Sequence, residues 1–134
     1  RKTIAFFTFA TGAKCYSVEW WNDLYEKFYP KYSEEYNLIE ILPVEDISML
    51  DRKLPTFYSK DVREIAAFMN NCELLVAADS GMMHLGVAAP TKTIGLFKSG
   101  HFNKYKPYGK GNTMVLVEDN NHLPVIEALD KILK

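Results

Sequence analysis

The sequence predicts a single α/β domain of the Rossmann-like type, a three-layer α/β/α arrangement with a mainly parallel sheet. Short apolar runs alternate with longer segments of helical period, which is typical of a parallel sheet covered by helices on both faces. The chain has 134 residues, enough for one hydrophobic core, and shows no repeat or internal linker. We therefore expect residues 1–134 to form one domain.

Six apolar runs are the expected strands. Each is short enough for a strand and carries the continuous apolar character of strands buried on both faces. The expected strands are Thr3–Phe9, Leu38–Leu42, Leu74–Ala78, Thr93–Phe97 and Thr113–Val117, with a weaker one at Pro55–Tyr58.

Four segments of helical period separate or follow these runs. The first extends from Ser17 to Tyr29, and we expect Pro30 to interrupt or end it because proline lacks the amide hydrogen that a helix needs. The second begins with Asp61-x-x-Glu64, a pattern that resembles a capping box. The four expected helices are Ser17–Tyr29, Asp61–Asn71, a segment from Ser80 or Gly81 to just before Pro90, and Leu123–Leu133.

Composition excludes several classes of function. The formal net charge is -1, from 16 basic and 17 acidic residues, so we expect no nucleic-acid partner. No apolar run approaches the roughly 18 residues of a membrane span, so membrane contact is at most peripheral. Two distant cysteines, Cys15 and Cys72, make neither a disulfide framework nor a zinc site. We expect a cytoplasmic location, no bound metal and, since Arg1 is not a start methionine, a longer parent polypeptide.

The stretch Asp79-Ser80-Gly81 with His84 invites three chemical interpretations. A nucleophilic Ser80 is disfavoured because Gly-x-Ser-x-Gly is absent and no downstream acid is placed to orient His84. A metal site is disfavoured because Asp79 and His84 are the only clustered ligands. Asp79 and Ser80 are also suitable caps for the helix that follows, with His84 as a core residue.

An anion site is the third interpretation. In parallel sheets, ligands bind beyond the carboxyl ends of the strands, where a helix N-terminus presents unpaired amide hydrogens. Amides of Ser80, Gly81 and Met82, with the Ser80 hydroxyl, would hold phosphate oxygens. Asp79 would contact sugar hydroxyls or orient loop amides.

The first strand ends in similar chemistry. Thr8, Thr11, Gly12 and Lys14 supply hydroxyls, a flexible turn and a cation beside the same edge of the sheet. This segment matches neither a P-loop nor a dinucleotide fingerprint. Two strand ends with anion-suited residues nevertheless favour a diphosphate ligand.

These residues resemble the C-terminal half of glycosyltransferase family 9, the heptosyltransferase-like enzymes. Members commonly carry Asp-Ser/Thr-Gly-x-x-His-Leu-Ala-x-Ala and then Pro-Thr-x-x-Leu-Phe-Gly, and here Asp79–Ala88 and Thr93–Phe97 follow that order and spacing. The family's Lys-x-Trp-Pro-x-Glu-x-Trp is similar to Lys14–Trp21, with Tyr for the first Trp and Ser for Pro. Pro107-Tyr108-Gly109 resembles a later loop.

The resemblance implies one half of a GT-B type glycosyltransferase that binds a nucleotide-diphospho-sugar, typically ADP-heptose, without a bound metal or other cofactor. The acceptor, a lipopolysaccharide core or other lipid-linked glycan, and the general base would belong to an N-terminal domain that these residues do not include. Such an enzyme works in the cytoplasm, with peripheral contact to the inner membrane. This chain alone is therefore expected to be inactive.

Carried over residue by residue, Lys14 would neutralise the donor diphosphate. Ser80, Gly81 and Met82 would hold the phosphates, and Asp79 would contact the sugar. His84 would lie on the donor or support the loop. The remaining positions are a nucleobase pocket at Ser59 and Lys60 and a family acidic residue at Glu45, which the sequence does not separate from Asp46.

The chain departs from the family pattern at two lysines. Lys92 stands in the segment before the Thr93 strand, and Lys98 replaces the glycine after Leu-Phe. Both are expected to change loops near the ligand and so the identity of sugar and base. They also support an alternative, a non-catalytic module that binds nucleotide-sugars. A small hydrolase that uses Ser80 is the other alternative.

Overall fold

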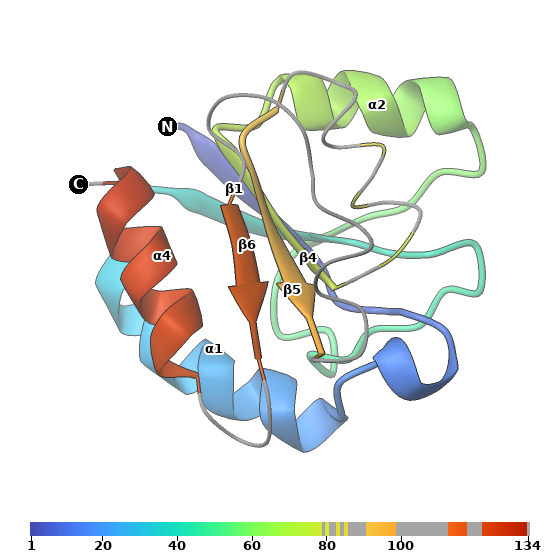
Figure 1. The fold of residues 1–134 in the computed structure, drawn as a ribbon. Helices are drawn as coiled ribbons and strands as arrows, with labels where there is room; N and C mark the ends of the chain where they lie inside the picture. Colours follow the sequence, from blue (N-terminus) through green and yellow to red (C-terminus); the bar gives the residue numbers. More distant parts are fainter. Residues whose placement is uncertain are drawn as a thin grey trace.

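A computed structural model of the chain shows a six-stranded sheet with helices on both faces (Figure 1). It describes residues 1–78, 80, 83, 85, 91–98, 113–117 and 122–133. The strand order is β3-β2-β1-β4-β5-β6, and all five neighbouring pairs are parallel. The predicted fold class is confirmed.

The strands agree with the predicted runs to within two residues at each end. Every residue of the central strands β4 and β5 is buried, which is why the sequence shows them as continuous apolar runs. The strands are β1 Thr3–Phe7, β2 Asn37–Ile41, β3 Thr56–Phe57, β4 Leu74–Ala78, β5 Thr93–Phe97 and β6 Thr113–Leu116.

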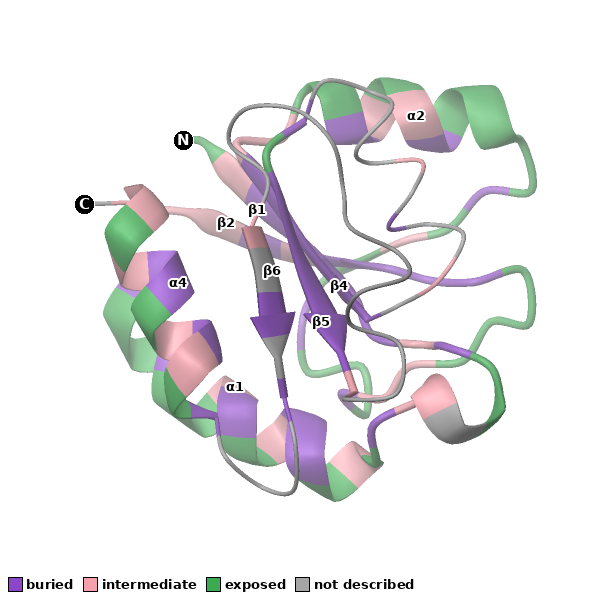
Figure 2. Cartoon of the chain, viewed as in Figure 1, coloured by how far each residue is buried: buried purple, intermediate pink, exposed green. Residues whose placement is uncertain are grey.

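The helices cover the sheet in two layers. Helices α1 (Val18–Tyr32) and α4 (Leu123–Leu133) cover one face, where the core includes Trp21, Phe28 and Leu129. Helix α2 (Val62–Asn70) covers the other face. The buried residues of each helix lie on the side towards the sheet (Figure 2).

Helix α1 begins as predicted and ends later than predicted. The Ser17 hydroxyl accepts a hydrogen bond from the backbone N–H of Trp20 at 3.0 Å, an N-cap contact. The helix then continues past Pro30 to Tyr32, so the prediction that Pro30 ends or interrupts it is wrong. Pro30 is exposed and removes a single backbone hydrogen bond near the helix end. Tyr32, buried one turn after Phe28, holds the last turn on the core.

Polar contacts of Asp130 and His122 tie α1 to α4 and to the residue before it, on the same face. Lys31 Nζ lies 2.7 Å from Asp130 Oδ2. His122, which precedes α4, is buried. Its Nε2 lies 3.0 Å from the Trp20 carbonyl oxygen, and its Nδ1 lies 3.1 Å from Lys27 Nζ. Burial and the Lys27 charge lower the pKa of His122. Because the Lys27 ammonium can only donate and the Trp20 carbonyl can only accept, the two contacts fit the tautomer in which Nδ1 accepts from Lys27 and Nε2–H donates to Trp20.

Candidate functional site

Among the residues that the structure describes, the predicted site residues follow the carboxyl ends of strands, at one edge of the sheet. Because all strands are parallel, the segments after β1, β2, β3, β4 and β5 leave from the same edge. The strand order reverses direction between β1 and β4, which is the switch point where open α/β sheets bind ligands. Lys14 follows β1 and Ser80 follows β4, so the two lie on the segments that flank this point.

The segment after β1 forms a short exposed turn. Thr11 and Gly12 are exposed, Lys14 is half-buried, and Gly12–Lys14 is a single 3-10 turn. Gly12 has φ +58, a left-handed conformation that glycine adopts without a steric penalty. Thr11 and Lys14 are therefore both placed at the carboxyl edge.

The same segment then crosses the edge towards β5 and β6. Lys98 directly follows β5, and its Nζ lies 3.3 Å from the Cys15 carbonyl oxygen. The Tyr16 hydroxyl donates to the carbonyl of Val117, which directly follows β6, at 3.4 Å. Since β4 lies between β1 and β5 in the sheet, the segment from Lys14 to Tyr16 passes the carboxyl end of β4.

Ser80 makes the hydrogen bond of a helix cap. Its Oγ accepts from the backbone N–H of Met83 at 3.3 Å, and Met83 and Leu85 have helical backbone. The capping role predicted for Ser80 is confirmed. In this contact the hydroxyl oxygen accepts, so the hydroxyl hydrogen can still be donated to a ligand.

Gly95 of β5 leaves room for Met83. A Cβ at Gly95 would lie 2.6 Å from Met83 Sδ. The missing side chain at Gly95 thus lets Met83 pack directly on β5.

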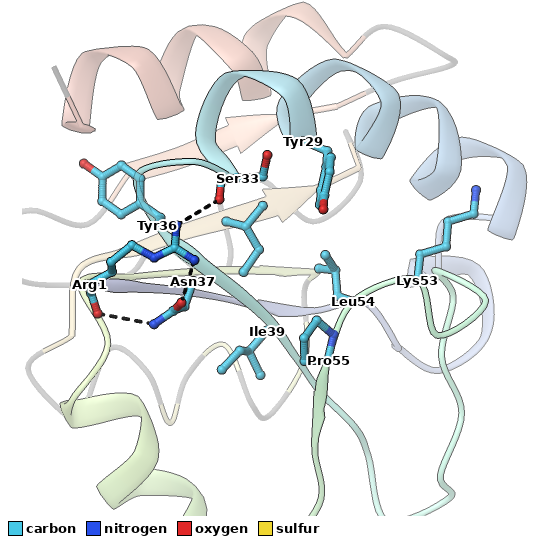
Figure 3. A pocket seen from close by; sticks show the side chains of 10 residues that line it. Arg1, Tyr29, Ser33, Tyr36, Asn37, Ile39, Lys53, Leu54 and Pro55 are labelled. Atoms are coloured by element: carbon cyan, nitrogen blue, oxygen red, sulfur yellow. Dashed lines mark hydrogen bonds between the residues drawn. The ribbon is translucent and has the colours of Figure 1, made fainter.

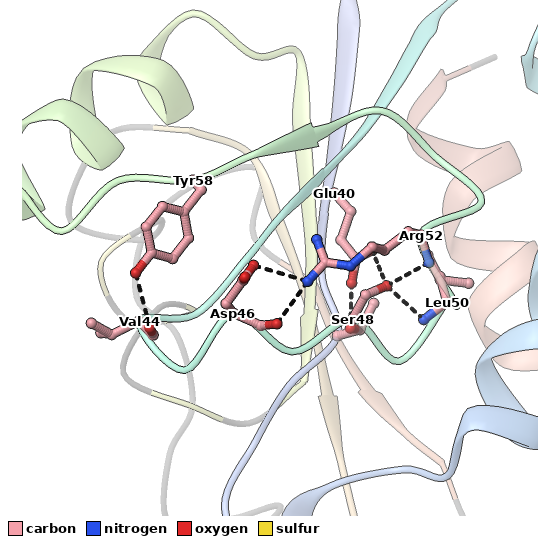
Figure 4. Close-up of polar contacts among 8 residues, drawn as sticks. Glu40, Val44, Asp46, Ser48, Leu50, Arg52 and Tyr58 are labelled. Atoms are coloured by element: carbon pink, nitrogen blue, oxygen red, sulfur yellow. Dashed lines mark hydrogen bonds and ion pairs between the residues drawn. The ribbon is translucent and has the colours of Figure 1, made fainter.

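Thr8 belongs to a buried network rather than to the surface (Figure 4 shows the part around Ser48). Its side chain is fully buried and donates to Glu40 Oε2 at 2.7 Å, while its oxygen accepts from the Met49 amide at 3.1 Å. The other oxygen, Glu40 Oε1, accepts from Ser48 at 2.6 Å. A hydroxyl has one hydrogen, and Thr8 gives it to Glu40. The geometry therefore supports Thr8 as an anchor of the loop after β2.

Glu40, near the carboxyl end of β2, is a buried acid that the sequence analysis did not single out. It lies in β2, is fully buried, and holds the 43–54 loop through its two hydroxyl donors. Burial raises the pKa of the Glu40 carboxyl, and hydrogen bonds from Ser48 and Thr8 and the charge of Arg52 oppose that rise. One sequence signal could have revealed Glu40: it is an acid within the apolar run 38–42. A charge in a buried strand needs hydrogen-bond partners, so such an acid predicts a buried polar network.

The structure separates Glu45 from Asp46. Asp46 has φ 61, and Arg52 NH2 lies 2.9 Å from its carboxylate and 2.8 Å from its carbonyl oxygen (Figure 4). Glu45 is exposed. The Tyr58 hydroxyl donates to the Val44 carbonyl at 3.0 Å and joins this turn to the segment after β3. Both acids are exposed, but Asp46 is engaged by Arg52, whereas no hydrogen bond or ion pair of Glu45 is seen among the described residues.

Ser59 is engaged in starting helix α2. Its hydroxyl donates to Glu64 Oε1 at 2.7 Å and accepts from the Asp61 amide at 3.0 Å, while the Asp61 carboxylate caps Arg63 N–H at 2.9 Å. The predicted cap at Asp61 is confirmed, but Glu64 bonds to Ser59 instead of returning to the Asp61 amide as in a capping box. Ser59 is buried, and Lys60 beside it is exposed. Their role in a nucleobase pocket stays a prediction.

The two unusual lysines lie at opposite edges of the sheet. Lys92 is exposed and precedes β5, at the amino edge, whereas Lys98 follows β5 at the carboxyl edge. Lys92 therefore lies at the edge of the sheet opposite to the predicted site, and an effect of Lys92 on the ligand loops stays a prediction. Only Lys98 lies at the edge that carries the predicted site.

A surface cavity of about 240 Å³ lies at the amino edge, away from the predicted site (Figure 3). It is lined by Leu38 of β2, Pro55, Tyr29 and Lys53, among others. Arg1 closes one side, where its guanidinium donates to backbone carbonyls at the end of α1. None of the predicted site residues that the structure describes lines this cavity.

Four predicted site residues, Asp79, Gly81, Met82 and His84, lie outside the described residues, as do Pro107–Gly109 and most of the third predicted helix. Among the residues that are described, no group of three or more His, Cys, Asp or Glu is placed to hold a metal ion. In that same part of the chain, no helix has both the length and the apolarity needed to cross a membrane.

The family comparison matches the C-terminal part of the chain. The model of glycosyltransferase family 9 (heptosyltransferase) matches residues 60–134, more than half of the sequence. The match includes Ser80 and Lys98 and begins after Lys14. A sequence comparison with curated proteins gives no match.

Solved structures match nearly the whole chain in fold. Escherichia coli ADP-heptose lipopolysaccharide heptosyltransferase II has TM-score 0.76 and 16% identity, over 99% of this chain and 46% of that chain. E. coli heptosyltransferase WaaC with ADP has TM-score 0.78 and 14% identity, over 98% and 44%. A Veillonella parvula family 9 glycosyl transferase has TM-score 0.69 and 20% identity, over 99% and 39%. The chain thus spans less than half the length of these structures.

Proposed function

The chain belongs to glycosyltransferase family 9, and from this premise we propose that it is the donor-binding half of an enzyme that uses a nucleotide-diphospho-sugar. The observation that carries the proposal is the placement of Lys14 and Ser80 on the two segments that flank the switch point between β1 and β4. A cation on one segment and a capped helix start on the other are suited to a diphosphate.

The proposed donor is an ADP-sugar, with heptose or a related sugar. Support comes from the E. coli structures of similar fold, which are described as containing ADP and an ADP-2-deoxy-2-fluoro heptose. The proposed acceptor is a lipopolysaccharide core or another glycan. Acceptor site and general base would belong to the other half of the enzyme, so this chain binds the donor and does not transfer the sugar.

The proposed chemistry is direct displacement at the anomeric carbon. As the bond to the sugar breaks, negative charge grows on the leaving diphosphate. Lys14 and the amides of Ser80, Gly81 and Met82 would stabilise this charge. Asp79 would orient the sugar, and His84 would contact the donor or support its loop. Glu45, Ser59 and Lys60 would lie on the nucleoside side, with Thr11 beside the phosphates.

Isothermal titration calorimetry of the 134-residue chain with ADP, ADP-heptose, UDP-glucose and GDP-mannose, in EDTA, tests the proposal. We expect binding of an ADP compound without metal. A hydrogen bond to a charged group contributes about 1.5–3 kcal/mol, so Lys14→Ala and Ser80→Ala should each weaken binding roughly tenfold or more. The matched control is Lys92→Ala, which removes a cation at the opposite edge and should leave affinity unchanged. No binding by any nucleotide, or binding that Lys14→Ala and Ser80→Ala leave intact, would contradict the proposal.

The alternative is a non-catalytic module that binds nucleotide-sugars, and the cation Lys98 at the carboxyl edge favours it. Transfer assays on the full-length gene product separate the two. Sugar transfer from an ADP-sugar supports the enzyme. Donor binding with neither transfer nor hydrolysis of the donor supports the non-catalytic module. Covalent labelling of Ser80 by a fluorophosphonate would instead favour a hydrolase.

A further inference from the structure

Lys98 connects the end of β5 to the segment that carries Lys14. Its Nζ lies 3.3 Å from the Cys15 carbonyl oxygen and 5.0 Å from the centroid of the Tyr16 ring. The ammonium therefore makes a hydrogen bond and a cation–π contact to two consecutive residues. The hydrogen bond to Cys15 joins positions 83 residues apart in sequence.

The far end of that segment is firmly held by the core. Tyr16 is buried, its ring stacks on Trp20 with centroids 4.4 Å apart, and its hydroxyl donates to Val117. Trp20 in turn packs against His122 at 4.9 Å. From Tyr16 onwards the chain is fixed to both β6 and helix α1.

The near end of the segment begins in an exposed turn. Thr11 and Gly12 are exposed, and Thr11 makes no side-chain cap hydrogen bond. The 3-10 turn is closed by long backbone hydrogen bonds, Lys14 N to Thr11 O at 3.3 Å and Cys15 N to Gly12 O at 3.2 Å. Lys98 makes its hydrogen bond to Cys15, one residue after Lys14. This is the position between the exposed turn and the buried Tyr16.

We propose that Lys98 is a positioning residue for the donor diphosphate: it clamps the backbone at Cys15 and Tyr16 and so fixes Lys14 beside the carboxyl end of β4. This inference rests on the proposed function. Holding the turn in place before the ligand arrives lowers the ordering cost of binding. Lys98 acts through Lys14, so its contribution depends on the charge that Lys14 presents.

Two substitutions at Lys98 separate the clamp from its charge. Lys98→Met keeps the length of the side chain and removes the donor and the charge. Lys98→Arg keeps a donor for the Cys15 carbonyl and a cation for the Tyr16 ring. Lys92→Met is the matched control, since it removes one lysine charge from the other end of the same strand.

Hydrogen–deuterium exchange without ligand tests the clamp itself. We expect the amides of residues 12–16 to exchange at least tenfold faster in Lys98→Met, and at the parent rate in Lys98→Arg and Lys92→Met. Exchange that is unchanged in Lys98→Met would overturn the clamp whether or not the chain binds a nucleotide.

Calorimetry with ADP and adenosine tests the positioning role. We expect Lys98→Met to weaken ADP about tenfold and adenosine less than twofold, with ADP affinity restored in Lys98→Arg. In a double-mutant cycle, Lys98→Met should cost little further affinity once Lys14 is Ala, because the two residues act as a unit. Equal losses for ADP and adenosine, or additive losses with Lys14→Ala, would overturn the inference.

Failure of the inference is distinct from failure of the proposed function. If the parent binds ADP and Lys98→Met binds it equally well, the positioning role is refuted and donor binding stands. If the parent binds no nucleotide, the proposed function is refuted and the positioning role with it.

Discussion

Glu40 provides the sharpest test of how the loop after β2 is held. Its carboxylate accepts hydrogen bonds of 2.7 Å from Thr8 and 2.6 Å from Ser48, and each hydrogen bond to a charged group is worth about 1.5–3 kcal/mol. Glu40→Ala removes both, about 3–6 kcal/mol, and relieves the cost of burying a carboxylate, which offsets part of the loss. We expect unfolding free energy to fall by about 2–4 kcal/mol.

Urea unfolding followed by tryptophan fluorescence measures this change, because Trp20 and Trp21 are both buried in the core. Glu45→Ala is the control, since Glu45 is an exposed acid of the same loop and its loss should change stability by less than about 0.5 kcal/mol. A Glu40→Ala chain as stable as Glu45→Ala would refute the argument that Glu40 holds the loop.

The contribution of Glu40 to the unfolding free energy depends on pH, with a sign that follows from its pKa. Burial raises the pKa of Glu40 in the folded chain above its ordinary value of 4.5, so the folded state binds the proton more tightly than the unfolded state. The stability contributed by protonation is fully present below pH 4.5 and is lost as pH rises through the folded pKa. The stability of the parent relative to Glu40→Gln should therefore increase between pH 7 and pH 4. A constant or decreasing difference would contradict the raised pKa.

Three further predictions concern packing and helix ends. Gly95→Ala places a Cβ 2.6 Å from Met83 Sδ and should lower the unfolding free energy by about 1–3 kcal/mol, measured by urea unfolding; no change would show that Met83 moves away freely. His122→Leu should remove the hydrogen bond to the Trp20 carbonyl. Because the folded pKa of His122 is lowered, the parent, unlike this variant, should lose stability as pH falls below 6.5, and parallel pH profiles would contradict this. Pro30→Ala, at an exposed position inside α1, should raise the unfolding free energy by about 1–3 kcal/mol, and an unchanged or lower denaturation midpoint would contradict it.

The strands could be predicted well because strands that are buried on both faces consist mostly of apolar residues, which are visible in the sequence. Strands such as β4 and β5, buried on both faces, leave continuous apolar runs. The end of α1 was harder to predict, since the rule that proline breaks helices is local. The burial of Tyr32 against the core, which overrides it, depends on tertiary packing.

For the candidate site, the shared edge of the described residues could be predicted, whereas their hydrogen-bond partners could not. Parallel strands bring Thr11, Lys14 and Ser80 to one edge without any tertiary detail. Thr8 was predicted to offer its hydroxyl to a ligand because it lies at the end of the first apolar run. Its hydrogen bond to Glu40, 32 residues away, follows from no local pattern. The opposite placement of Lys92 and Lys98, by contrast, follows from the direction of one predicted strand.

An ADP titration followed by ¹H–¹⁵N NMR tests the central claim most directly, because it locates the binding site on the chain. Donor binding at the carboxyl edge predicts amide shifts that cluster at residues 11–16, at Ser80 and at Lys98, with residues 37–39 and 53–55 around the amino-edge cavity unaffected. Shifts that cluster around that cavity, or no shifts at millimolar ADP, would contradict the account.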